Sequence, residues 1–129
     1  MNKTDARILK HIQSEIAIAR SLLAGVGFVD FDSNEEKKRA VAMTVINVGE
    51  LAKHLSDEFF DSFAAADLKY AAKTRDVYAH GYATLSFPMV YKTATESFLK
   101  LEALIQEILK TDSSTSEATT EPPDPSLRA

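Results

Sequence analysis

The sequence predicts an all-α protein, an antiparallel four-helix bundle followed by a disordered C-terminal tail. Apolar residues recur three and four positions apart in four separate stretches, which is the spacing of one buried face on a helix. Short connections join these stretches, and no segment shows the alternating pattern of a strand. Four amphipathic helices with short connections pack most simply as a bundle.

Composition narrows the class of protein. The chain has 129 residues, 45% hydrophobic and 26% charged, which fits one globular domain. The absence of cysteine excludes disulfides and thiolate metal sites. We expect a cytoplasmic protein, because the chain has neither a signal-peptide pattern nor a run of apolar residues that could span a membrane. The formal net charge is only −4, so any contact with nucleic acid has to rely on local positive charge.

The first helix is predicted over residues 4 to 24, with Thr4 as its N-cap and Asp5 favourable in the first turn. Gly25 and Gly27 end it, since glycine tolerates the left-handed conformation of a helix C-cap. The segment from there to the next helix is expected to be a loop. The predicted buried stripe consists of Ile8, Ile12, Ile16, Ala19 and Leu23.

The second helix is predicted from a capping box, in which Ser33 caps the helix and Glu36 follows three residues later. It runs to about Leu55. Residues 56 to 66 form a connection with a short helical turn, and its three phenylalanines are expected to cover one end of the core. The predicted stripe consists of Val41, Thr44, Val45, Val48, Leu51, Ala52 and Leu55.

The third helix is predicted to be capped by Asp67 and to weaken at Gly81. Ser86 caps the fourth helix, with Pro88 in its first turn. The apolar stripe of this last helix consists of Val90, Ala94, Phe98, Leu101, Ile105 and Ile108.

The composition changes abruptly after Lys110, to Ser, Thr, Pro and acidic residues with almost nothing to bury. Such a composition is typical of disorder. The sequence therefore divides into a helical domain of residues 1–110 and a disordered tail of residues 111–129.

One stretch on the third helix carries most of the chemistry. Arg75-Asp76-Val77-Tyr78-Ala79-His80-Gly81-Tyr82 combines a guanidinium, a carboxylate, an imidazole and two phenols. Asp76 and His80 are four apart and share a face, so the carboxylate can orient the imidazole. Arg75 and His80, five apart, do not share a face on a straight helix. A bend at Gly81, or two copies of the helix meeting across a two-fold axis, would bring them together.

These residues also have ordinary structural interpretations. A single histidine on a helix is more often a surface or core residue than a catalyst, and neighbouring Arg and Asp often form only a solvated pair. A metal site is the weaker alternative. Its ligands would be His11, His54 and His80, with Glu15 and Glu50 as companions.

The stretch from Arg75 to Tyr82 resembles the signature of HEPN domains, and especially of HepT-like ribonuclease toxins from toxin–antitoxin pairs. That signature is Arg, a polar residue, three further residues, His, any residue and Tyr. Val48-Gly49-Glu50-Leu51-Ala52-Lys53 is similar to the Gly-Glu segment of the family's second helix. The order of four helices also agrees, so the resemblance covers roughly residues 5 to 110. Two features depart from it, since Asp76 stands where these toxins usually have Asn and the chain lacks the Trp often found before the motif helix.

The resemblance implies a metal-independent endoribonuclease toxin that needs no cofactor and works as a homodimer or higher homo-oligomer. Its partner is a minimal nucleotidyltransferase antitoxin, which inactivates it by transferring AMP to a tyrosine. By position, Arg75 and His80 are the catalytic pair, Asp76 is a supporting residue and Tyr82 is the modified residue. Histidine suits proton transfer near neutral pH, and arginine suits a phosphate.

Lys69 and Lys73 extend the motif face toward the N-terminus of the helix, and they are candidate contacts for RNA. An alternative function is a non-catalytic helical module that binds a nucleotide or a partner nucleotidyltransferase. The presence of both Arg75 and His80 favours the enzyme.

Overall fold

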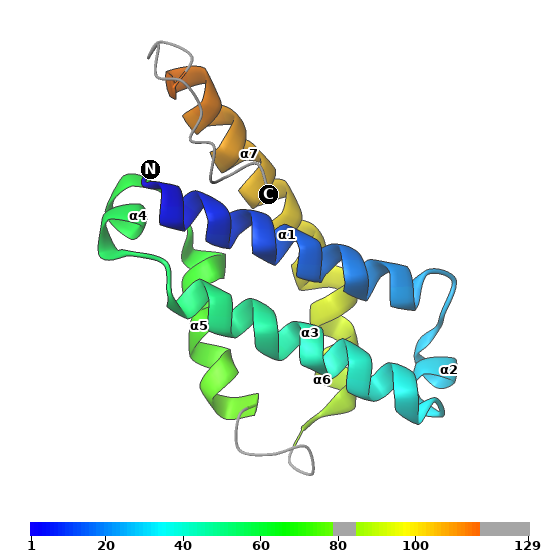
Figure 1. The fold of residues 1–129 in the computed structure, drawn as a ribbon. Helices are drawn as coiled ribbons and strands as arrows, with labels where there is room; N and C mark the ends of the chain where they lie inside the picture. The colour runs from blue at the N-terminus through cyan, green and yellow to red at the C-terminus, as the bar shows by residue number, and fades with distance from the viewer. Residues whose placement is uncertain (79–84, 117–129) are drawn as a thin grey trace.

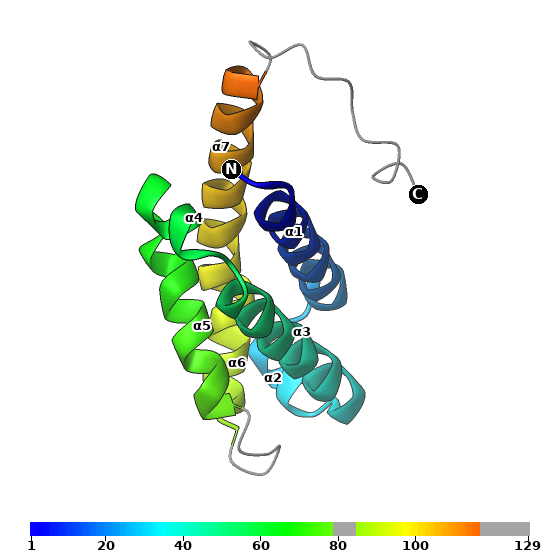
Figure 2. The ribbon, with the colours of Figure 1, turned by 60° about the vertical axis from the view of Figure 1, so that its left-hand side comes forward.

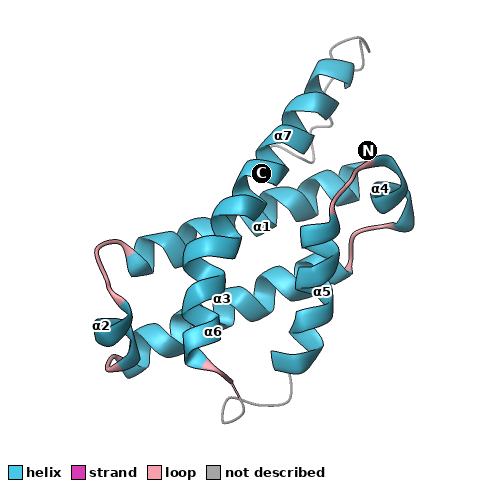
Figure 3. Ribbon diagram, turned by 180° about the vertical axis from the view of Figure 1, so that it is seen from behind, coloured by secondary structure: helices cyan, strands magenta, loops and turns pink. Residues whose placement is uncertain are grey.

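The computed structural model describes residues 1–78 and 85–116, and in these ranges every regular element is a helix and no strand occurs (Figure 3). The all-α prediction is therefore confirmed. In chain order the elements are α1 (Lys3–Leu23), α2 (Phe28–Asp32), α3 (Glu35–Lys53), α4 (Asp57–Ser62), α5 (Ala66–Tyr78), α6 (Phe87–Lys92), a π-helical segment (Thr93–Ser97) and α7 (Phe98–Ser116). Across the two described ranges, no helix has both the length and the apolar character needed to cross a membrane.

α1 and α3 run antiparallel, and α5 and the last long helical rod cross them obliquely (Figures 1 and 2). α1 and α3 lie side by side as one pair. α5 packs against α3, and the rod made by α6, the π-helical segment and α7 packs against α1 and α3. α3 is the central element, because it packs against both α1 and α5. This arrangement confirms the predicted antiparallel bundle.

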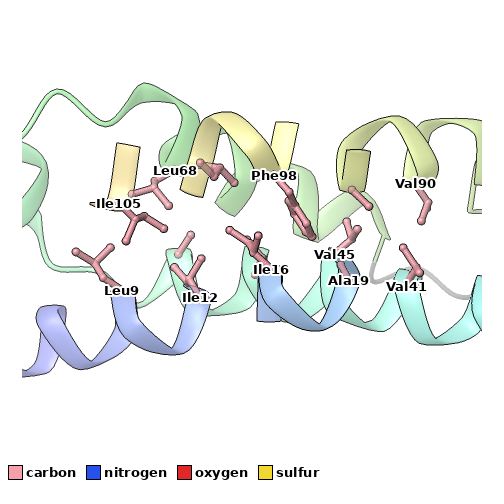
Figure 4. Packing of buried hydrophobic residues seen from close by; sticks show 14 of the residues in the cluster. Leu9, Ile12, Ile16, Ala19, Val41, Val45, Leu68, Val90, Phe98 and Ile105 are labelled. Carbon is pink, nitrogen blue, oxygen red and sulfur yellow. The ribbon is translucent and has the colours of Figure 1, made fainter. Parts of the chain in front are cut away.

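The core follows the predicted stripes closely, and all six apolar residues predicted for the fourth helix are buried. Figure 4 shows Leu9 from α1, Leu68 from α5 and Ile105 from α7 gathered in one part of the core, with Val41 from α3 and Val90 from α6 in another. Each long helix therefore contributes one apolar face to a single core.

The start of α1 differs from the prediction. Asn2 is the N-cap, and its side chain accepts a hydrogen bond from the backbone N–H of Asp5, so Thr4 lies inside the helix. Leu9 is fully buried in place of Ile8, and the buried face continues back to Asp5, which is 1% exposed. The Asp5 carboxylate accepts hydrogen bonds from the backbone N–H of Ser56 at 3.0 Å and from its hydroxyl at 2.5 Å. Asp5 therefore ties α1 to the N-cap of α4 and does not simply face solvent in the first turn.

The connection between the first two long helices is not the loop that was predicted. Residues Phe28–Asp32 form α2, which buries Phe31 completely against Tyr91 and Phe87 of α6. The predicted capping box is also wrong. Ser33 follows the end of α2, and the side chain of Asn34 caps α3 by accepting from the backbone N–H of Lys37.

Other predicted boundaries hold or move slightly. Gly25 has a φ of 72°, the left-handed conformation expected just after a helix. Ser86 caps α6 as predicted. Asp67 lies in the first turn of α5 and is not its cap. α7 extends through Ser116, past the boundary expected at Lys110, and the remainder of the expected tail lies outside the described residues.

Candidate functional site

The structure describes part of the motif that the sequence identifies. Arg75 lies in the last turn of α5, and Asp76 follows it on the same helix. His80 and Tyr82, together with the expected bend at Gly81, lie outside the described residues. The site is therefore built outward from Arg75.

Arg75 forms an ion pair with Glu50 of α3. The Nε atom of Arg75 lies 2.6 Å from Oε2 of Glu50. Neither atom is accessible to solvent, although the two side chains as a whole are 29% and 42% exposed. A charged contact hidden from water is screened less than a surface pair, and the loss of either partner leaves the other desolvated. The pair therefore fixes the head of the Arg75 side chain against α3.

Gly49 allows the two helices to approach closely at this point. A Cβ atom placed on Gly49 would lie 2.5 Å from Cβ of Arg75 and 2.8 Å from the backbone oxygen of Ala71. Any larger residue at position 49 would therefore push α5 away from α3. The root of the Arg75 side chain is packed against the backbone of α3, one residue before the glutamate that holds its head.

The second oxygen of Glu50 contacts another helix residue. Oε1 of Glu50 lies 3.3 Å from Nε2 of His54, one turn further along α3. This contact agrees with the shared face that the four-residue spacing predicts. The two carboxylate oxygens of Glu50 are thus divided between the imidazole of His54 and the guanidinium of Arg75.

The metal alternative gains no support from the described part of the chain. No group of three or more His, Cys, Asp or Glu residues there is arranged to hold a metal ion. His11 is exposed on α1. Its proposed companion Glu15 accepts a hydrogen bond from the side-chain amide of Asn47 on α3, at 3.2 Å.

Lys69 and Lys73 are both exposed on α5, on the helix that carries Arg75. The ammonium group of Lys69 lies 5.3 Å from the centre of the Phe60 ring, within the range of a cation–π contact. Both ammonium groups can therefore add positive charge to the surface of α5.

A family model described as Ribonuclease HepT-like matches residues 12–108, which include the whole motif from Arg75 to Tyr82. The chain belongs to the HepT-like ribonuclease family. Comparisons with curated proteins and with solved structures gave no match.

The family resemblance in the sequence points to the Gly-Glu segment, but the sequence does not identify its partner. Glycine inside a helix costs about 1 kcal/mol relative to alanine, so its presence at position 49 signals a packing or functional reason. That signal does not say which helix approaches. Only the crossing of α3 and α5 shows that both Gly49 and Glu50 of this HepT-like chain contact Arg75.

Proposed function

We propose that this HepT-like chain is a metal-independent endoribonuclease that acts as the toxin of a toxin–antitoxin pair. The observation that carries the proposal is the family match over residues 12–108, which contains Arg75 and His80 at the spacing of the HEPN signature. The ion pair that secures Arg75 adds support, because a cation held in place is what phosphate recognition requires.

The proposed reaction uses the nucleophile that RNA itself contains. The ribose 2′-hydroxyl loses its proton and its oxygen forms a bond to the adjacent phosphorus. The bond from phosphorus to the 5′-oxygen breaks, and that oxygen gains a proton. The products are a 2′,3′-cyclic phosphate and a 5′-hydroxyl, and no water is consumed in this step.

Within this reaction Arg75 stabilises the charge that develops on the phosphate oxygens, since a guanidinium stays charged and its planar fork matches two oxygens. His80 transfers a proton, because imidazole exchanges protons readily near neutral pH. Asp76, four residues before His80 in the sequence, supports the imidazole. Lys69 and Lys73 contact the RNA backbone along α5.

The proposal includes partners of two kinds. A homodimer or higher homo-oligomer would build a shared cleft from two copies of the motif. A minimal nucleotidyltransferase antitoxin, encoded beside the toxin, would transfer AMP from ATP to the hydroxyl of Tyr82 and release pyrophosphate. The added phosphate would then compete with RNA for Arg75. All of these steps fit a cytoplasmic setting.

The test is cleavage of total cellular RNA in the presence of a chelator by wild-type protein, Arg75→Ala, His80→Ala and the double variant. Each single change should lower the rate by about 100-fold or more, in the range of acid–base and charge-stabilising groups. The double variant should lose little beyond the worse single variant, because residues acting on one transition state are not additive.

A matched control is Arg20→Ala. Arg20 also forms an interhelical pair with a glutamate, through two contacts of 2.8 and 3.0 Å from Nη1 to Glu102, but it lies on α1. Its loss should leave the cleavage rate unchanged. Activity that survives in both single motif variants would show that Arg75 and His80 do not carry the cleavage. Wild-type protein that cleaves no RNA would leave the binding-module alternative.

A further inference from the structure

We infer that Glu50 is the positioning residue for Arg75, holding its guanidinium in place for RNA phosphate. This inference rests on the proposed ribonuclease function and adds a residue of α3 to a site whose described members lie on α5. Glu50 acts only through Arg75.

Arg75 is held at two points along a side chain that would otherwise sample many rotamers. Its Cβ and Cγ pack against Gly49, as a Cβ built on Gly49 would meet them at 2.5 and 3.2 Å. Its Nε atom is held by Oε2 of Glu50 at 2.6 Å, away from solvent. This charged contact is hidden from water, so it limits the positions that the guanidinium can take. Both points of attachment come from consecutive residues of α3.

The contact with Glu50 differs from another interhelical Arg–Glu pair in the atoms that meet. At Arg20 both oxygens of Glu102 lie within 3.0 Å of Nη1. At Arg75 the ion pair with Glu50 is made at Nε, and the other oxygen of Glu50 contacts His54. Glu50 therefore contacts the guanidinium at Nε, the nitrogen that joins the group to the rest of the side chain.

The experiment compares Glu50→Ala and Glu50→Gln with wild type in single-turnover RNA cleavage, with RNA affinity measured separately. Glu50→Ala should lower the cleavage rate by roughly 10- to 100-fold, since a misplacement of about 1 Å at a reacting centre costs on that order. RNA affinity should change far less. Glu50→Gln should recover most of the rate, because its side chain has the same length and can place an oxygen beside Nε of Arg75.

Glu102→Ala is the matched control, since it removes a carboxylate from another interhelical Arg–Glu pair. It should leave the cleavage rate unchanged. Circular dichroism and thermal melting of every variant separate loss of position from loss of fold. If Glu50→Ala is unstable, the Glu50→Gln comparison and the NMR measurement below still test the inference.

The Nε–H resonance of Arg75 in ¹⁵N NMR spectra reports the contact without any reference to activity. It should exchange slowly with water in wild type and in Glu50→Gln, and rapidly in Glu50→Ala. A rate for Glu50→Ala equal to or above wild type would overturn the positioning role, and so would a Glu50→Gln rate as low as that of Glu50→Ala. A wild-type protein that cleaves no RNA would reject the proposed function, whereas active wild type with an equally active Glu50→Ala would reject this inference alone.

Discussion

Replacing Gly49 with alanine tests how closely α3 and α5 are packed. The new Cβ would lie 2.5 Å from Cβ of Arg75 and 2.8 Å from the backbone oxygen of Ala71. Neither atom can rotate away, because one is the root of a side chain and the other belongs to the backbone of α5. The Ala71 oxygen also accepts a hydrogen bond from the hydroxyl of Thr74, so a displacement there involves the whole turn.

The cost can be estimated from these distances. Carbon atoms in contact normally lie about 3.5 to 4.0 Å apart, so α5 has to move by about 1 Å. Overpacking of this kind costs up to about 3 kcal/mol. Alanine returns about 1 kcal/mol through its better helix propensity. The net loss is about 2 kcal/mol, which corresponds to a fall in melting temperature of roughly 8 °C at about 4 °C per kcal/mol.

The measurement is thermal unfolding followed by circular dichroism at 222 nm, with Gly27→Ala as the matched control. A Cβ on Gly27 would meet nothing within 4 Å, and this glycine has an ordinary φ of −76°. Gly27→Ala should cost less than about 1 kcal/mol, as expected at an N-cap without a side-chain bond. A melting temperature for Gly49→Ala at or above that of wild type would show that α3 and α5 do not approach as closely as described.

Two further predictions concern Asp5 and Tyr82. Asp5→Ala should lower the free energy of unfolding by about 2 to 3 kcal/mol, because the backbone N–H and hydroxyl of Ser56 lose a charged acceptor. Chemical denaturation measures this free energy, and a decrease below about 0.5 kcal/mol would contradict the prediction. Incubation with ATP and the neighbouring nucleotidyltransferase should add AMP to wild type but not to Tyr82→Phe, as read by intact mass; unchanged labelling of the variant would assign the acceptor to another residue.

Much of the fold could be predicted from sequence because helix burial follows a simple period. The stripe from Val90 to Ile108 is buried as predicted, with every member inside the core. The misses occur where polar or short segments gain their structure from distant partners. Asp5 is buried where it accepts hydrogen bonds from Ser56, the N-cap residue of α4. The short helix α2 is stabilised because its Phe31 packs against Tyr91 and Phe87 of α6.

The candidate site shows the same limit. Spacing within one helix correctly places Glu50 beside His54, four residues apart. Spacing cannot place Glu50 beside Arg75, because that contact depends on how α3 crosses α5. Periodicity describes which residues share a face of one helix, and it contains no information on which residue of another helix will meet that face.

The guanidinium of Arg75 is therefore held at the interface between α3 and α5. Arg75 belongs to α5, but α3 supplies both the space at its root and the carboxylate at its head. A substitution that separates the helices will move the guanidinium even when every residue of the motif is intact. Gly49→Ala should for this reason lower the cleavage rate under conditions where the variant is still folded. Glu50→Ala should do so by releasing the guanidinium, with a smaller effect on the spacing of the helices. In both variants the cleavage rate should fall by more than the fraction of folded protein falls. That result would show that residues of α3 determine the position of the Arg75 guanidinium.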